Sequence, residues 1–214
     1  MAFLSDKDLK ALEKRFEALQ KPVKLINFSQ ELECQYCRET RTLLEEVAAI
    51  SDKIELSVYN FQLDKEKAEQ FQIDKIPATV VMAEKDPGIR FFGIPSGYEF
   101  ASLLEAIELV SSDKSPLSKE TLDALATIDS NVHIQVFVTP TCPYCPSAVA
   151  TAHALAHASD HIRADMIEAT EFPHLVNKYG VMGVPRVVIN EHTFFEGALP
   201  ENLYVAKVLE AVKK

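Results

Sequence analysis

The sequence of 214 residues has only four cysteines, no excess of basic residues and no long hydrophobic run. All four cysteines fall in two Cys-x-x-Cys pairs, so none is left for the long-range disulfides of small secreted proteins. The formal net charge is −10, and both halves of the chain are acidic, which argues against binding to a phosphate backbone. No apolar run approaches the roughly 20 residues that cross a bilayer. Charged residues at 6–8 also interrupt the region where a signal peptide would be apolar. We therefore expect a cytoplasmic protein, with neither nucleic acid nor membrane as a partner.

The two halves of the chain repeat each other. Leu4-Ser5 recurs as Leu117-Ser118, each before a helical pattern that the serine is expected to cap. From the cysteines onward, one offset of 108 residues pairs positions of like chemistry: Cys34 with Cys142, Tyr36 with Tyr144, Cys37 with Cys145, Phe71 with Tyr179, Ile73 with Val181, and Pro77 with Pro185. The repeat predicts two similar domains, residues 1–115 and 116–214, joined by a linker at 111–116 that is rich in Ser, Asp, Lys and Pro.

Strand and helix patterns alternate within each half. Apolar, β-branched runs predict strands at 23–28, 78–82 and 89–92, and again at 132–138, 186–189 and 193–195. Apolar periodicity predicts helices that follow the cysteine pairs, at 38–50 and 147–158, and a closing helix in each half. The expected fold class is α/β, with two tandem domains that each have a central mixed β-sheet flanked by helices.

Each cysteine pair lies between a predicted strand and a predicted helix. An attacking thiol must be ionised, and a free cysteine with a pKa near 8.5 is mostly protonated at neutral pH. Unpaired N–H groups and the dipole at a helix N-terminus favour a thiolate, so we expect lowered pKa values for Cys34 and Cys142. Cys37 and Cys145, three residues on, are expected to resolve the mixed disulfide formed with a substrate. The four cysteines are therefore the predicted catalytic residues.

A proline follows the first cysteine of each pair by 43 residues. X-Pro bonds are the common source of cis peptides, and a proline that opens a strand lacks the N–H of a ladder. We expect the bonds Ile76-Pro77 and Val184-Pro185 to be cis and to lie beside the sulfur atoms, with Tyr36 and Tyr144 in the first helical turns. An extended substrate segment would then pair with the exposed backbone, as in strand addition. The predicted substrate-binding residues are Ile76, Pro77, Val184, Pro185, Tyr36 and Tyr144.

These residues resemble the thioredoxin superfamily, and their doubled arrangement resembles the archaeal and bacterial protein disulfide oxidoreductases, also called glutaredoxin-like proteins. Cys34-Gln35-Tyr36-Cys37 and Cys142-Pro143-Tyr144-Cys145 are both forms that this family uses. The resemblance covers nearly the whole chain. It implies two thioredoxin folds in one monomer, with reductase, oxidase and isomerase activity on protein disulfides. It also implies redox-active disulfides with no other cofactor, reduced by an NADPH-linked flavoprotein of the thioredoxin-reductase type.

Two features depart from the patterns of the superfamily. Thioredoxins have a buried aspartate six residues before the first cysteine, where this chain has Phe28 and Val136. Glu31 and Glu33 are the candidate proton acceptors at the first site, and the second site has no equivalent. Glutaredoxins carry a Gly-Gly turn that helps to bind glutathione, whereas the turns here are Gly93-Ile94-Pro95 and Gly197-Ala198-Leu199. Glutathione is therefore not expected as a dedicated ligand.

The two cysteine pairs differ in their charged neighbours. Glu33 adjoins Cys34, and a nearby carboxylate raises the pKa of a thiol, although Arg38 and Arg41 can offset this effect. No charged residue adjoins the second pair. We therefore predict that Cys142 is the more acidic of the two attacking thiols.

The sequence leaves two alternatives to an enzyme of this kind, and it contains one possible set of metal ligands. The first function is a dedicated dithiol electron carrier between a flavoprotein reductase and a peroxidase, with a peroxiredoxin as partner. The second is a Zn(Cys)₄ module, but 104 residues separate Cys37 from Cys142, far more than the usual roughly 15–20. His153, His157 and His161 are four residues apart, a spacing that could place metal ligands on one face of a helix. We expect instead that they form a solvent-exposed row on that face. No metal ligands are therefore predicted.

Overall fold

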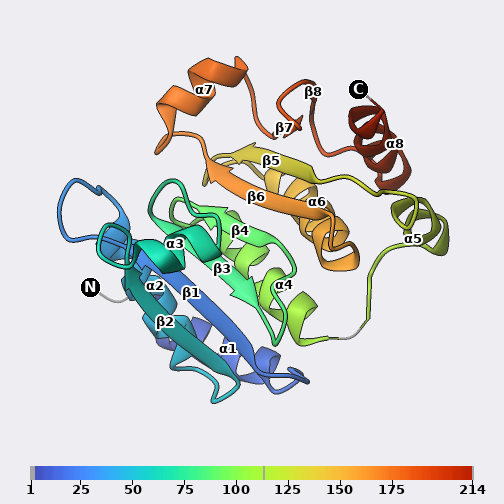
Figure 1. Cartoon of the computed structure of the whole chain (residues 1–214). Helices are drawn as coiled ribbons and strands as arrows, with labels where there is room; N and C mark the ends of the chain where they lie inside the picture. Colours follow the sequence, from blue (N-terminus) through green and yellow to red (C-terminus); the bar gives the residue numbers. More distant parts are fainter. Residues whose placement is uncertain (1–2, 113, 214) are drawn as a thin grey trace.

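The structure is a computed structural model that describes residues 3–112 and 114–213. In this part of the chain, eight helices surround one eight-stranded sheet (Figure 1). The strands are β1 (Val23–Ser29), β2 (Ile54–Asn60), β3 (Ala78–Met82), β4 (Ile89–Phe92), β5 (Val132–Val138), β6 (Ile162–Glu168), β7 (Arg186–Ile189) and β8 (Thr193–Glu196). The helices are α1 (Asp6–Phe16), α2 (Cys37–Ala48), α3 (Lys65–Gln70), α4 (Glu99–Ser111), α5 (Lys119–Leu125), α6 (Cys145–Ala158), α7 (Pro173–Tyr179) and α8 (Glu201–Val212).

The sheet is two copies of one strand pattern joined edge to edge. Its order is β2-β1-β3-β4-β6-β5-β7-β8. In each copy the first two strands pair in parallel, and the third strand is antiparallel to its neighbours on both sides. β4 then pairs in parallel with β6, with Phe92 opposite Ile167, and this ladder joins the halves. The predicted α/β class with mixed sheets is confirmed, while the repeat in the sequence could not show that the two sheets are continuous.

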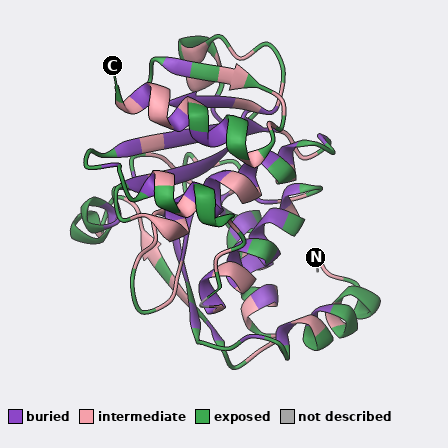
Figure 2. Ribbon diagram, turned by 90° about the vertical axis from the view of Figure 1, so that its right-hand side faces the viewer, coloured by how far each residue is buried: buried purple, intermediate pink, exposed green. Residues whose placement is uncertain are grey.

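Apolar clusters on both faces of the sheet also run across the junction. The larger cluster takes residues from α1, α2, α4, α5, α6 and α8, and the smaller one lies on the side of α3 and α7. Both clusters contain residues of both halves. Figure 2 shows the buried residues along the strands and on the helix sides that face them, with exposed residues on the outer surfaces. Because α6 packs beside α4 and over both β4 and β6, the junction is part of the core.

The helix starts follow the sequence signals. Ser5 and Asp8 form a reciprocal capping box at α1, in which Asp8 N donates to Ser5 Oγ and Ser5 N donates to Asp8 Oδ2. Ser118 caps α5 by accepting a hydrogen bond from Thr121 N. The predicted boundary at residues 115 and 116 falls in the connection between α4 and α5.

The prediction that the three histidines are exposed to solvent is wrong for His153. His153 on α6 is only 2% exposed, and its ring packs edge-to-face on Phe91 of β4, with centroids 4.9 Å apart. Burial lowers the pKa of His153 to about 4, so the ring is neutral at neutral pH. The helix face that a separate domain would expose is covered here by the other half. His161 lies beyond the end of α6.

Candidate active sites

Each cysteine pair forms a disulfide at the start of a helix. Cys34 is bonded to Cys37 and Cys142 to Cys145, and in both pairs the Cα atoms lie 5.5 Å apart. The second cysteine of each pair is the first residue of α2 or α6, so the helices begin slightly earlier than predicted. The first cysteine lies just outside the helix, beside its unpaired N–H groups, where a thiolate would be favoured.

The resolving sulfurs are more protected than the attacking ones. Cys37 and Cys145 are buried, Cys34 is half-buried, and Cys142 is 7% exposed. Tyr36 and Tyr144 occupy the N-cap positions rather than the first turn. Tyr144 is 72% exposed, which leaves a free aromatic face beside the second disulfide.

Both predicted cis peptide bonds are present, at Ile76-Pro77 and Val184-Pro185. At the second site the Sγ atom of Cys142 lies 3.7 Å from the carbonyl oxygen of Val184, so the cis-proline loop is in contact with the sulfur. Each proline precedes a strand whose hairpin closes the site, because Gly93 N donates to Pro77 O and Gly197 N donates to Pro185 O. Each cis-proline is thus bonded to a glycine turn, and at the second site it also lies beside the disulfide.

Counting six residues back from each first cysteine did not identify Asn27, a buried amide near the first disulfide. In the ladders, Phe28 is opposite Ala78 and Phe137 is opposite Arg186, so these two phenylalanines are the structural counterparts. The first loop is therefore one residue longer, and Asn27 is the counterpart of Val136. The placement of the thioredoxin acid at Phe28 is wrong, because Phe28 belongs to the smaller cluster on the opposite face. A polar residue flanked by the apolar Ile26 and Phe28 was the available signal.

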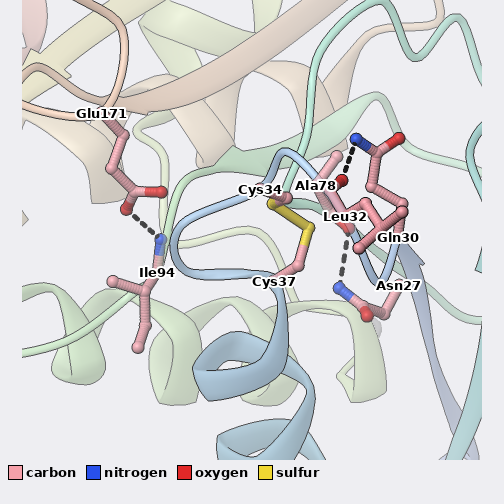
Figure 3. Close-up of a disulfide and its surroundings, with 8 residues drawn as sticks. All are labelled: Asn27, Gln30, Leu32, Cys34, Cys37, Ala78, Ile94 and Glu171. Atoms are coloured by element: carbon pink, nitrogen blue, oxygen red, sulfur yellow. Dashed lines mark hydrogen bonds between the residues drawn. A yellow bond between two sulfur atoms is a disulfide. The ribbon is translucent and has the colours of Figure 1, made fainter.

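Asn27 lies close to the first disulfide, as Figure 3 shows. The residue is fully buried, its Nδ2 donates to Ala78 O at 3.0 Å, and its Oδ1 has no partner among the described residues. An unpaired buried oxygen costs free energy, and a hydrogen-bond donor formed nearby would relieve that cost. Once the disulfide is reduced, a thiol of Cys37 would be a donor in this vicinity.

Charged groups are arranged differently around the two disulfides. Glu31 and Glu33 are exposed to solvent, and Arg41 is paired with Glu45 at 2.8 Å. On another side of the first disulfide, Glu171 accepts a hydrogen bond from Ile94 N at 2.7 Å (Figure 3). Burial raises the pKa of Glu171 to about 7, and Glu168 adds a like charge.

The start of α4 approaches the second site from the first half. Tyr98 N donates to Pro140 O at 2.9 Å, in the loop that precedes Cys142. The next residue, Glu99, is 1% exposed, and only one of its carboxylate oxygens has a partner among the described residues, the hydroxyl of Ser102. Burial raises the pKa of Glu99 to about 7.

This arrangement supports two-electron exchange between sulfur atoms. The four cysteines form two separate disulfides, and the described residues contain no group of three or more His, Cys, Asp or Glu that could hold a metal ion. In the same part of the chain no helix combines the length and apolarity of a membrane span. The fold and the paired redox-active disulfides define a thioredoxin-fold disulfide oxidoreductase.

Comparisons with known proteins agree with this class. The model of the thioredoxin domain family matches residues 132–210. A protein disulfide oxidoreductase from Aeropyrum pernix K1 superposes with a TM-score of 0.92 at 31% identity, over 98% of this chain and 94% of that one. The N-terminal domain of the alkyl hydroperoxide reductase AhpF from Enterococcus faecalis V583 gives a TM-score of 0.89 at 27% identity, over 96% and 100% of the two chains. The chain belongs to the protein disulfide oxidoreductases of the thioredoxin superfamily, with two tandem thioredoxin folds.

Curated relatives are similar at a lower level and are much longer. The alkyl hydroperoxide reductase AhpF of Escherichia coli K12 is 27% identical over 198 residues, which are 92% of this chain and 36% of the relative. An NADH dehydrogenase of Bacillus subtilis 168 is 27% identical over 172 residues, which are 80% and 31% of the two chains. The chain thus spans about a third of the length of these relatives.

Proposed function

We propose that this protein catalyses thiol–disulfide exchange on protein substrates, and that it reduces, forms or isomerises their disulfides at both sites. The observation that carries the proposal is the repeated geometry of a disulfide at a helix start beside a cis-proline. The proposed catalytic residues are Cys34, Cys37, Cys142 and Cys145. The proposed substrate-binding residues are Ile76, Pro77, Val184, Pro185, Tyr36 and Tyr144.

In the reductive direction, the thiolate of Cys34 or Cys142 attacks one sulfur of a substrate disulfide. A mixed disulfide forms and one substrate thiolate leaves. The neighbouring Cys37 or Cys145 then attacks the enzyme sulfur of the mixed disulfide, which releases the second substrate thiol and leaves the enzyme disulfide seen here. Two electrons pass from the enzyme dithiol to the substrate, and the reverse sequence oxidises a substrate dithiol. Rearrangement of the mixed disulfide before resolution would isomerise the substrate.

The proposed partners follow from this cycle. A reducing enzyme must be reduced in turn, and we propose an NADPH-linked flavoprotein of the thioredoxin-reductase type as the donor, in the cytoplasm. The similarity to AhpF supports a second candidate function, a dedicated dithiol carrier between a flavoprotein and a peroxidase such as a peroxiredoxin. Two intact Cys-x-x-Cys sites favour the broader activity on protein disulfides.

An insulin-reduction assay and a refolding assay on a scrambled disulfide protein test the proposal. The wild type and the single variants Cys34→Ser and Cys142→Ser are expected to be active, and the double variant is expected to fall to the uncatalysed rate. A wild type that reduces a peroxidase but neither insulin nor the scrambled protein would support the dedicated carrier instead. A double variant as active as the wild type would contradict both functions.

A further inference from the structure

The same glycine turn follows the cis-proline hairpin in each half, but only one of the two turns is covered. Gly93 N donates to Pro77 O at 2.9 Å, and Gly197 N donates to Pro185 O at 2.8 Å. Both glycines have positive φ, of 91° and 83°. The local geometry of the two turns is therefore equivalent, and differences between them arise from what packs against each.

The second half covers the turn of the first site. β4 is an internal strand that pairs with β6, so the loop after β6 lies against the residues that follow β4. A Cβ atom on Gly93 would lie only 2.6 Å from Glu168 Cβ and 2.7 Å from Glu171 Oε1. By contrast, β8 ends the sheet, and a Cβ on Gly197 would meet no atom of the described chain within 4 Å.

Glu171 makes a specific contact across this junction. Its carboxylate accepts the hydrogen bond from Ile94 N at 2.7 Å, while its own backbone N–H donates to Glu168 Oε2 at 2.8 Å. Thr170 Oγ1 also donates to Glu168 Oε2, so Glu168 holds the loop that presents Glu171. Glycine at position 93 leaves the space for this approach. At the second turn, the counterpart of Ile94 is Ala198, and no carboxylate among the described residues binds its N–H.

We propose that Glu171, supplied by the second half, is a positioning residue of the first site. Its carboxylate holds the Gly93–Ile94 turn in place against the Ile76-Pro77 loop, where a substrate segment would pair. The first site would thus be completed by the other half, whereas the second site has an open turn. This inference rests on the proposed exchange with protein substrates, because it concerns how the first site binds them.

The test uses full-length variants with one working site. A first-site variant carries Cys142→Ser and Cys145→Ser, and a second-site variant carries Cys34→Ser and Cys37→Ser. Glu171→Ala is then added to each, because alanine cannot accept the hydrogen bond from Ile94. Glu171→Gln keeps an acceptor oxygen and is the conservative rescue. The second-site variant that carries the same Glu171→Ala substitution is the matched control, because its own glycine turn has no contact with Glu171.

The expected result is a change in KM at one site only. In the first-site variant, Glu171→Ala should raise the KM for insulin about fivefold, as expected for the loss of one typical hydrogen bond, with kcat changed less than about twofold. Glu171→Gln should stay within about twofold of the parent, and the second-site variant should not respond. An unchanged KM in the first-site variant, or equal losses at both sites, would overturn the inference while leaving the proposed function intact. If the unmutated first-site variant does not reduce insulin, the function proposed for that site fails, and this inference fails with it.

Discussion

The two halves share a strand order, a disulfide at a helix start and a cis-proline hairpin, but their hairpins lie in different surroundings. β4 is internal to the joined sheet and fully buried, whereas β8 is an edge strand with an exposed Phe194. The first site is consequently in contact with Glu171 of the other half, and the second site keeps its glycine turn open. A repeat in sequence thus specifies the local chemistry twice, while the place of each copy in the sheet decides what covers it.

The largest expected difference between the halves concerns their glycine turns. Gly93→Ala and Gly197→Ala impose similar strain, about 1–2 kcal/mol, because both positions have positive φ. Gly93→Ala adds overlap with Glu168 and Glu171, so we expect a total loss of about 3 kcal/mol or more, against about 1 kcal/mol for Gly197→Ala. Urea unfolding of both variants measures the difference in unfolding free energy. Equal losses would show that the junction does not restrict the first turn.

Glu99 and Glu201, the first residues of α4 and α8, allow a second comparison of the halves. It concerns how the free energy of unfolding depends on pH. Burial raises the pKa of Glu99 to about 7, from 4.5, so the folded state retains a proton that the unfolded state loses. The contribution of Glu99 to the free energy of unfolding is complete below pH 4.5 and is lost as the pH rises through 7. Glu99→Gln removes the buried charge, and we expect a gain of about 3 kcal/mol at pH 8 with no gain at pH 4.

Glu201 on α8 is the matched control for Glu99. Its pKa is lowered by hydrogen bonds from Thr121 and Ser118, so its contribution is present above the unfolded pKa and is lost as the pH falls. Glu201→Gln should therefore reduce stability at pH 8, by less than about 1 kcal/mol because the group is partly exposed. Thermal unfolding at pH 4 and pH 8 tests both signs. A loss of stability for Glu99→Gln at pH 8 would contradict the account of its burial.

Asn27, the buried amide at the first site, is expected to cause a smaller difference between the two sites. Asn27→Val introduces the residue found at the counterpart position, Val136, and removes the hydrogen bond to Ala78 O. We expect a loss of about 1 kcal/mol in unfolding free energy and a slower release of the mixed disulfide at the first site, by about threefold. Stopped-flow reduction of a labelled substrate by the first-site variant measures the second effect. Unchanged resolution would assign Asn27 a structural role alone.

Much of the fold could be predicted from the chain because its signals are local. The strand runs, the serine caps and the prolines at a fixed distance from the cysteines depend on neighbouring residues, and the structure has them nearly where the patterns place them. The join between β4 and β6 depends on a contact between halves, which leaves no periodic signal. For the same reason the burial of His153 and the contact between Glu171 and Ile94 were not foreseen.

The most direct test of the account is the pH dependence of alkylation of Cys34 and Cys142, each measured in a variant whose other three cysteines are serine. Iodoacetamide reacts with the thiolate, so the rate against pH gives each thiol pKa. We predict both values below the roughly 8.5 of a free cysteine, with Cys142 lower by about one unit because the carboxylate of Glu33 adjoins Cys34 in the chain. A value at or above 8.5 for either thiol would contradict the claim that these helix starts hold reactive thiolates, and a lower pKa for Cys34 would reverse the predicted difference between the sites.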